Sequence, residues 1–256
     1  SVKISSHFIS FVFIFASSTN IYFSNEIEIK VSETKKNIKI KQNNFTDSVV
    51  VIGNNINDWN FYFEGYGTRR VDSKFDSNGI GGCITFLDSV VENISIFAQN
   101  MPCPNAVHFI NTNGTINKVE LFNSSSDAFD ADFSNLEVNH ANIVNTGGEC
   151  IGVKQGTYFF NKLNLSNCGD RSVSSGENAE TTLIDIEVLS ANVGLAAKDS
   201  SIIEAKKVIL RNVQKCILSF KQKNNYSASL VKTNKDNYFC SNDSFDIQKN
   251  SLWINN

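Results

Sequence analysis

Apolar and polar positions alternate along this chain in a pattern that returns every 22 residues. Each copy opens with a small residue and then an apolar one, and the copies start at Ala106, Ala128, Cys150, Ser172, Gly194 and Cys216. An upstream copy starts at Cys83, 23 residues before Ala106. Alternation with a period of two predicts β-strands that bury one face. The constant spacing predicts a stack of structural repeats.

A second alternating pair follows in each copy, and a polar residue stands near its end. The pairs are Val119/Leu121, Ala141/Ile143, Leu163/Leu165, Ile186/Val188 and Val208/Leu210, and the polar residues are Asn123, Asn145, Asn167, Ser190 and Asn212. Equivalent residues of stacked strands lie about 4.8 Å apart. The sequence therefore predicts a ladder of Asn side chains that satisfies the amides of successive turns.

A 22-residue unit of short strands without a helical period is typical of one turn of a parallel β-helix. Leucine-rich repeats have a similar length, but their Leu-x-x-Leu-x-Leu consensus is absent. The prediction is therefore an all-β fold, a right-handed parallel β-helix over 79–238, with the hand taken from the general rule for parallel crossovers. We expect 24–78 to form an N-terminal cap and irregular coils, and 239–256 a C-terminal cap or tail.

The amino terminus has one Lys, an apolar run from Phe8 to Ala16, and then small residues. The run is too short to span a bilayer, so no transmembrane segment is expected. It fits the apolar part of a secretory signal peptide, and the alternative is that 1–23 contains a buried strand. The signal-peptide interpretation predicts a secreted, periplasmic or cell-surface protein.

Composition narrows the class of protein. Hydrophobic residues make up 41% and charged residues 19% of the 256 residues, which excludes a disordered chain. Lys and Arg number 23 against 26 Asp and Glu, so a nucleic-acid partner is not expected. The six cysteines lack the spacing of a zinc site, and no metal site is predicted from them. They either fill the core as thiols, the simpler interpretation, or pair as disulfides whose connectivity the sequence leaves open.

Three segments resemble successive coils of a known bacterial repeat region: Ser126 to Phe133, Gly169 to Glu177, and Gly194 to Ser200. The region is a β-helix of the broad pectin-lyase-like kind, often found downstream of kinase-like domains of the spore-coat CotH type. The resemblance covers about 81–226 and implies architecture and a larger parent protein with a kinase-like domain, but no established activity.

This chain departs from that pattern at positions where such proteins tend to carry acids. It has Pro104-Asn105 before Ala106, and Cys150-Ile151-Gly152 after Glu149. Any acidic site shared with those proteins would be weakened here. These residues also lack the phosphate-binding loop and the HRD and DFG triplets of a kinase.

Stacking the copies brings charged residues together on the outward face. His108 is expected beside Asp130, Asp132 beside Lys154, and Lys198 two coils further on. Asp127, Glu149 and Arg171 are expected to stack in the turn just before them. Glu177 and Asp199 lie in the segments that carry the resemblance.

Two kinds of sugar chemistry fit these residues. Polysaccharide lyases on this fold use carboxylates that hold Ca²⁺, or a basic side chain that removes a proton next to a uronate carboxyl group. A glycoside hydrolase needs two carboxyl groups, and Asp130 and Asp132 would lie about 6.6 Å apart at Cα on one strand. The catalytic candidates are Asp130, Asp132, Lys154 and Lys198, and the substrate-binding candidates are His108, Asp127, Glu149, Arg171, Glu177 and Asp199. No cofactor is predicted apart from Ca²⁺ in the lyase interpretation.

Simpler interpretations stand beside these. The charges are then solvated groups on an exposed sheet, with Asp132 and Lys154 a cross-strand pair, and Asp170, Glu177, Lys198 and Asp199 serve the turns. Exposed Phe133, Phe220 and Tyr226 offer rings for stacking on sugars. The sequence favours a module that binds an extended polysaccharide on its lateral face. The alternatives are a lyase or hydrolase, and a structural accessory module of a CotH-like protein.

Overall fold

The computed structural model describes residues 10–14, 18–24, 26–68, 80–234, 237–240, 245–248 and 250–255, and this part of the chain contains strands and no helix. The strands are β1 (Ser10–Ile14), β2 (Thr19–Phe23), β3 (Glu28–Ser32), β4 (Asn37–Lys41), β5 (Val49–Ile52), β6 (Ile56–Asn57), β7 (Asn60–Glu64), β8 (Gly82–Leu87), β9 (Val90–Met101), β10 (Asn105–Ile110), β11 (Asn113–Ser124), β12 (Asp127–Thr146), β13 (Ile151–Gly176), β14 (Glu180–Lys198), β15 (Ile202–Phe220), β16 (Leu230–Thr233), β17 (Asn237–Cys240), β18 (Phe245–Ile247) and β19 (Leu252–Asn255).

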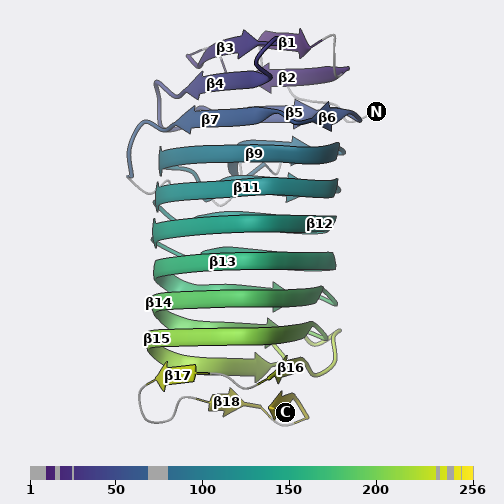
Figure 1. The fold of residues 1–256 in the computed structure, drawn as a ribbon, viewed down its shortest axis with the longest axis vertical. Helices are drawn as coiled ribbons and strands as arrows, with labels where there is room; N and C mark the ends of the chain where they lie inside the picture. Colours follow the sequence, from purple (N-terminus) through teal and green to yellow (C-terminus); the bar gives the residue numbers. More distant parts are fainter. Residues whose placement is uncertain are drawn as a thin grey trace.

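The long strands stack as parallel coils of one solenoid (Figure 1). Residues 22 apart are direct partners: Asp130 pairs with Gly152, and Ile143 with Leu165. The 23-residue step to the first copy is also present, because Ile84 pairs with Val107. The prediction of an all-β parallel solenoid with about 22 residues per coil is confirmed.

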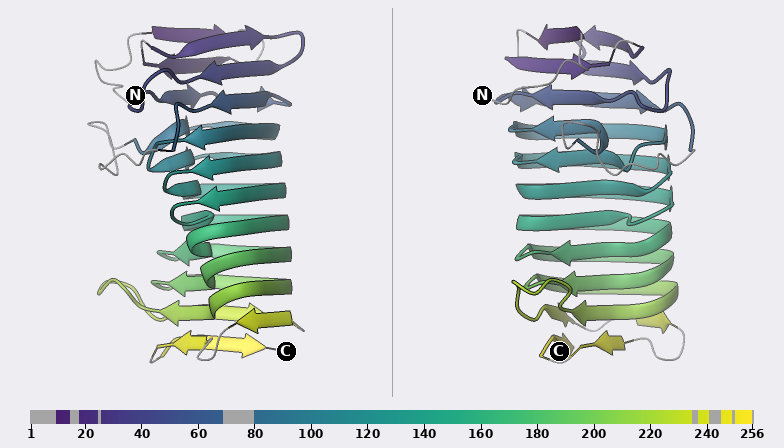
Figure 2. Two further views of the ribbon diagram at one scale, coloured as in Figure 1. Left: turned by 90° about the vertical axis from the view of Figure 1, so that its left-hand side faces the viewer. Right: turned by 180° about the vertical axis from the view of Figure 1, so that it is seen from behind.

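Strand pairing continues beyond 79–238 at both ends of the stack (Figure 2). On the amino-terminal side β4 pairs with β7 and β5 with β8, both parallel. Antiparallel pairs close this end, since β1 pairs with β2, β2 with β5, and β3 with β4. On the carboxy-terminal side β18 pairs with β15 and β19 with β16, both parallel. Residues 1–9 and 15–17 of the amino-terminal segment lie outside the described residues.

Inward-facing side chains form columns in the core. Phe86, Phe109 and Phe129 stack with ring centroids 4.9 and 5.1 Å apart, and all three are buried. Inter-coil spacing places similar rings over one another, so one coil's apolar face covers the next.

Three of the five polar corner residues, Asn123, Asn145 and Asn167, form the predicted ladder, with one difference. Asn123, Asn145 and Asn167 adopt left-handed backbone angles, φ 60°, 61° and 54°, which Asn tolerates better than most residues. The side-chain amide of Asn145 donates to Asn123 at 3.1 Å and that of Asn167 to Asn145 at 2.8 Å. The ladder thus bonds side chain to side chain, instead of side chain to turn amide.

Gly156 is required because its backbone lies very close to Ser134 of the preceding coil. Gly156 has φ 145°, and a Cβ at this position would overlap the carbonyl oxygen of Ser134. Only glycine combines that backbone angle with so close an approach.

Two disulfides connect Cys83 with Cys103 and Cys150 with Cys168, with Cα atoms 5.4 Å apart in each. Cys216 is disulfide-bonded as well. The simpler interpretation of most cysteines as thiols filling the core was therefore wrong, although the side chains are buried. The reason it failed is geometric: the bonded cysteines lie 20 and 18 residues apart, and one turn of the coil brings such residues together.

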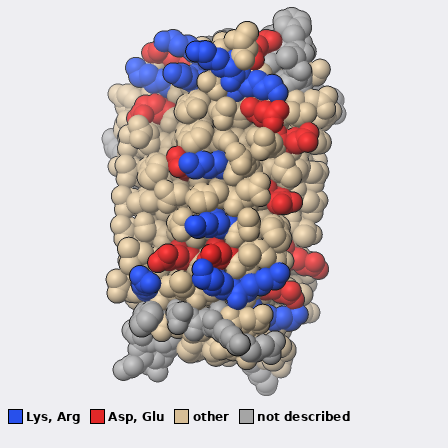
Figure 3. Space-filling view, viewed as in Figure 1, with Lys and Arg blue, Asp and Glu red and all other residues tan. Residues whose placement is uncertain are grey.

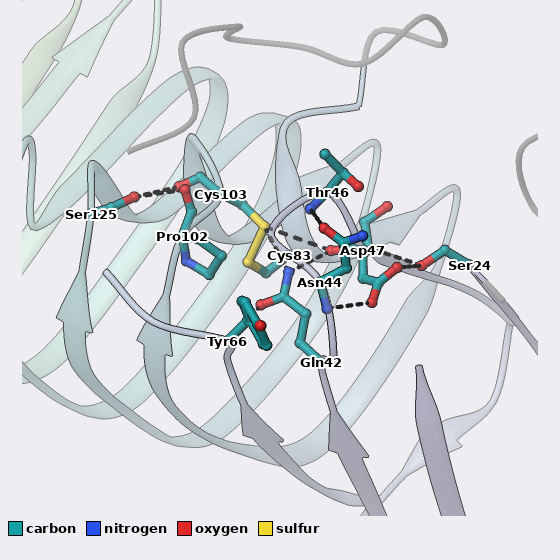
Figure 4. The surroundings of a disulfide bond; sticks show 11 residues. Ser24, Gln42, Asn44, Thr46, Asp47, Tyr66, Cys83, Pro102, Cys103 and Ser125 are labelled. Carbon is teal, nitrogen blue, oxygen red and sulfur yellow. Dashed lines mark hydrogen bonds between the residues drawn. A yellow bond between two sulfur atoms is a disulfide. The ribbon is translucent and has the colours of Figure 1, made fainter. Parts of the chain in front are cut away.

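The first disulfide also meets the amino-terminal coils (Figure 4). The side-chain amide of Gln42 donates to the carbonyl oxygen of Asp47 at 2.7 Å and lies 3.8 Å from the sulfur of Cys103. Asp47 in turn accepts from the Ser24 hydroxyl at 2.7 Å. These contacts connect the amino-terminal segment to the stacked coils.

Replacing a ring in the core column tests whether the coils are held by this packing. We expect Phe109→Ala to lower the free energy of unfolding by about 3–5 kcal/mol, because it leaves a cavity between two rings. Phe133→Ala is the control: that side chain is 59% exposed, and a change within about 0.5 kcal/mol is expected. Urea denaturation measures both, and equal effects would contradict the stacked core.

Candidate functional site

Four of the candidate residues meet on one lateral face of the solenoid. His108 of β10 pairs in register with Asp130 of β12, and Asp132 of β12 pairs with Lys154 of β13. Strand alternation points all four side chains away from the core column. We call these residues the His108 cluster.

The contacts in the His108 cluster are shared among all four members. The Nζ atom of Lys154 lies 3.0 Å from Asp132 Oδ1 and 3.5 Å from each oxygen of Asp130. The Nε2 atom of His108 lies 3.0 Å from Asp132 Oδ2 and 3.8 Å from Asp130 Oδ2. Each carboxylate therefore faces both the ammonium group and the imidazole.

Burial separates the members of the cluster. His108 is 1% exposed and Asp130 8%, whereas the side chain of Lys154 is 34% exposed. The interpretation of these residues as solvated charges on an open sheet was wrong for His108 and Asp130. The predicted cross-strand pair of Asp132 and Lys154 is confirmed, and these two residues are the partly exposed members of the cluster.

The pKa values of Asp130 and Asp132 shift in opposite directions. Burial raises the pKa of Asp130, and the charge of Lys154 only partly opposes it. Burial also acts to raise the pKa of Asp132, but the hydrogen bond from His108 and the charge of Lys154 outweigh it, and this pKa is lowered. Burial acts to lower the pKa of Lys154, yet Asp130 and Asp132 raise it. A lysine held protonated is suited to binding a carboxylate and poorly suited to removing a proton.

A second charged group lies in the turn that leads into these strands. The backbone N–H of Glu149 donates to Asp127 Oδ1 at 2.8 Å, and Arg171 Nη1 donates to Glu149 Oε1 at 2.5 Å. The Nζ atom of Lys198 lies 4.0 Å from the same Glu149 oxygen. The predicted stacking of Asp127, Glu149 and Arg171 is confirmed, and we call these three and Lys198 the Glu149 cluster.

Two glycines make room for the charged side chains. A Cβ on Gly152 would lie 2.7 Å from a Glu149 carboxylate oxygen and 3.1 Å from Asp130. A Cβ on Gly176 would lie 3.0 Å from the Lys198 side chain, which extends across it toward Glu149. Gly152 thus opens the space in which Glu149 and Asp130 approach each other.

Glu177 and Asp199 have local partners in the turns around residues 221–226. Asp199 is fully buried and accepts from the backbone N–H groups of Gln222 and Lys223, both at 2.7 Å. Glu177 accepts from the Lys223 ammonium group at 2.6 Å. The turn interpretation therefore holds for Asp199, whose acceptance of two consecutive backbone amides is ordinary turn chemistry.

Sequence reasoning missed two residues that position the His108 cluster. The amide of Asn105 donates to Asp130 at 3.2 Å. The buried Tyr158 hydroxyl lies 2.9 Å from the Lys154 carbonyl oxygen and 3.0 Å from that of Ala131, so it fixes the turn that carries Lys154. The only signal for Tyr158 was a tyrosine at a position where the neighbouring coils have Leu136 and Thr181.

The metal-binding capacity of the site follows from its donors. Ligand atoms of His108, Asp130 and Asp132 lie within 4.8 Å of one another. Ca²⁺ takes six to eight oxygens, whereas this set offers two carboxylates and an imidazole, and the Lys154 ammonium group already faces both carboxylates. The residues present do not fit Ca²⁺.

Comparison of this chain with known proteins finds no relative: no protein-family model, no curated protein and no solved structure matches it. Within the described residues, no helix has the length and apolarity needed to cross a membrane.

Asp127 makes the stability of the folded chain depend on pH. Burial and then the nearby Glu149 carboxylate raise its pKa to about 6. An acid whose pKa rises on folding favours the folded state at low pH, and this contribution is lost as the pH rises through 6. Asp127→Asn keeps the oxygen that accepts from Glu149 and removes the charge. We expect it to raise the free energy of unfolding by about 1–3 kcal/mol at pH 8 and to change it little at pH 4.

Urea denaturation across this pH range measures the effect. The matched control is Asp185→Asn, whose carboxylate pairs with Lys207 at 2.9 Å on the surface. It should change stability by less than about 1 kcal/mol at either pH. An Asp127→Asn protein no more stable than the parent at pH 8 would contradict the raised pKa.

Proposed function

We propose that this chain is an exported β-helix module that binds an extended polysaccharide on its lateral face. The observation that supports it is the register of polar groups from consecutive coils. Asp132 and Lys154 are neighbours, and Lys198 extends across Gly176 toward Glu149 of the adjoining cluster. A repeating surface of this kind suits a repeating, extended ligand.

The partly exposed atoms supply the contacts such a ligand needs. The Lys154 side chain is 34% exposed, and its ammonium group is a donor for sugar hydroxyl or carboxylate oxygens, while Asp132 is an acceptor for hydroxyls. Phe133, next to Asp132, is 59% exposed and offers an apolar ring for a sugar face. His108 and Asp130 support these groups from beneath.

The disulfides support the proposal of export. Disulfides persist in secreted and periplasmic compartments and are rare where thiols are kept reduced. Two bonds that each close about one coil are more consistent with an oxidising compartment than with a reducing one. The apolar run at 8–16 also fits a signal peptide, but its residues Ser10–Ile14 form β1 and pair with β2, as the strand alternative predicts, so the proposal of export rests on the disulfides.

A glycan panel tests the proposal. We expect the chain to retain at least one extended polysaccharide, and Phe133→Ala and Lys198→Ala to weaken its retention about tenfold, roughly the 1.4 kcal/mol of one good contact. Asp132→Ala should act in the same direction. Lys207→Gln, an exposed lysine elsewhere on the surface, is the control and should bind as the parent does. No retention of any glycan would leave a structural accessory module, which the resemblance to CotH-associated regions favours.

The divided pKa values of Asp130 and Asp132 favour a second candidate, a glycoside hydrolase. A carboxyl group with a raised pKa beside one with a lowered pKa is the pattern of a general acid and its partner, and oxygens of the two groups lie within 4.8 Å, near the spacing of retaining enzymes. Here Asp130 donates the proton to the leaving oxygen, and Asp132 is the ionised carboxylate.

Release of reducing ends from the retained glycan measures this activity. Asp130→Asn should lower the rate of hydrolysis of the retained glycan at least a hundredfold, the scale of a lost general acid. A panel of uronate polymers, followed by the absorbance of the unsaturated product with and without Ca²⁺, tests the lyase alternative. Absence of both products would exclude the enzymatic candidates on these substrates.

A further inference from the structure

A groove of about 660 Å³ lies on a different sheet of the solenoid, away from every candidate residue of the sequence analysis. Its lining residues come from five neighbouring strands, β3, β4, β7, β9 and β11. Four steps between paired strands, each about 4.8 Å, give the groove a length of about 19 Å along the stack. Figure 3 looks onto this face and shows lysine side chains, in blue, gathered at its upper end, where β3 and β4 lie.

Two columns of outward-facing residues form the walls. Strand register aligns one column as Lys30, Lys39, Tyr62, Phe97 and Glu120, and the other as Lys41, Glu64, Gln99 and Phe122. Each wall therefore combines charged or amide groups with aromatic rings over successive coils.

The aromatic part of the first wall is an ordered pair. Tyr62 and Phe97 stack with centroids 5.0 Å apart and planes 10° from parallel. Rings stacked along the solenoid turn their edges toward a ligand that lies in the groove. Aromatic edges carry the positive part of the ring quadrupole, so this wall tolerates an anionic neighbour. Tyr62 is 36% exposed, and its hydroxyl adds a hydrogen-bonding tip.

The charges of the groove leave two lysines without partners. Glu28 lies 3.7 Å from Lys41, and Glu120 lies 2.6 Å from Lys118. Glu64 accepts from the side-chain amides of Gln99 and Asn100. In the part of the chain that the structure describes, no carboxylate lies within 4.0 Å of the ammonium groups of Lys30 or Lys39. The end of the groove at β3 and β4 is thus positively charged and open to an anion.

We propose that this groove binds an anionic oligosaccharide, with the acidic group of one sugar at Lys30 and Lys39 and the following sugars along Tyr62 and Gln99. The extended shape, the stacked rings and the amide groups favour a sugar chain over a compact anion. The choice of a sugar rests on the proposed function, but the site is separate from the His108 cluster.

Titration calorimetry with an alginate hexasaccharide, a chain of uronates, tests the groove. We expect the Lys30→Gln/Lys39→Gln variant and Tyr62→Ala each to weaken binding at least tenfold, and rising salt to weaken binding to the parent chain. Lys162→Gln is the control, because Lys162 is an exposed lysine further along the same sheet. Maltohexaose, a neutral chain of equal length, should bind at least tenfold more weakly than alginate.

Each result decides between the sites. Alginate binding that survives the groove variants but falls in Phe133→Ala would overturn the groove and keep the proposed function. Failure to bind alginate, with other glycans retained on the panel, would overturn the groove alone, and failure to bind any glycan would overturn both. Poly-glutamate binding as tightly as alginate would replace the sugar with an acidic peptide. Equal thermal unfolding of variants and parent shows that the fold is intact.

Discussion

Hydrogen bonding between successive coils at constant register is the constraint on which the rest of this structure depends. Because each residue lies over the residue one coil away, a side chain is chosen for its vertical neighbours as much as for its own strand. The phenylalanine column of the core and the asparagine ladder of the corner are two outcomes of that rule. The corner adds a demand of its own, since its left-handed backbone restricts the choice of residue.

The same register explains what the sequence could and could not reveal. A repeat of constant length allows vertical neighbours to be counted, so Asp132 with Lys154 and Glu149 with Arg171 were predictable pairs. The burial of His108 and Asp130 was not predictable, because alternation shows only on which face of the strand a side chain lies. Burial on that face depends on neighbouring bulk and on gaps such as Gly152, which no period encodes. The disulfides were hidden for a related reason, as residues 18 or 20 apart meet only after the path of one coil is known.

The groove escaped sequence reasoning because its coils do not keep the common period. Ile38 pairs with Phe61 after 23 residues, but Phe61 pairs with Ile96 after 35. The insertion removes the spacing that makes a repeat visible, while the strands remain in register in space. Stacked Tyr62 and Phe97 therefore look unrelated along the chain.

The position of the disulfides has a mechanical consequence. Both bonds whose two cysteines are described span less than one coil, 20 and 18 residues, so neither of them joins distant parts of the solenoid. Between these two bonds, tension along the solenoid would be resisted by hydrogen bonds and packing, and coils would separate one after another. Each of the two bonds would keep the residues between its cysteines from extending until a reductant breaks it.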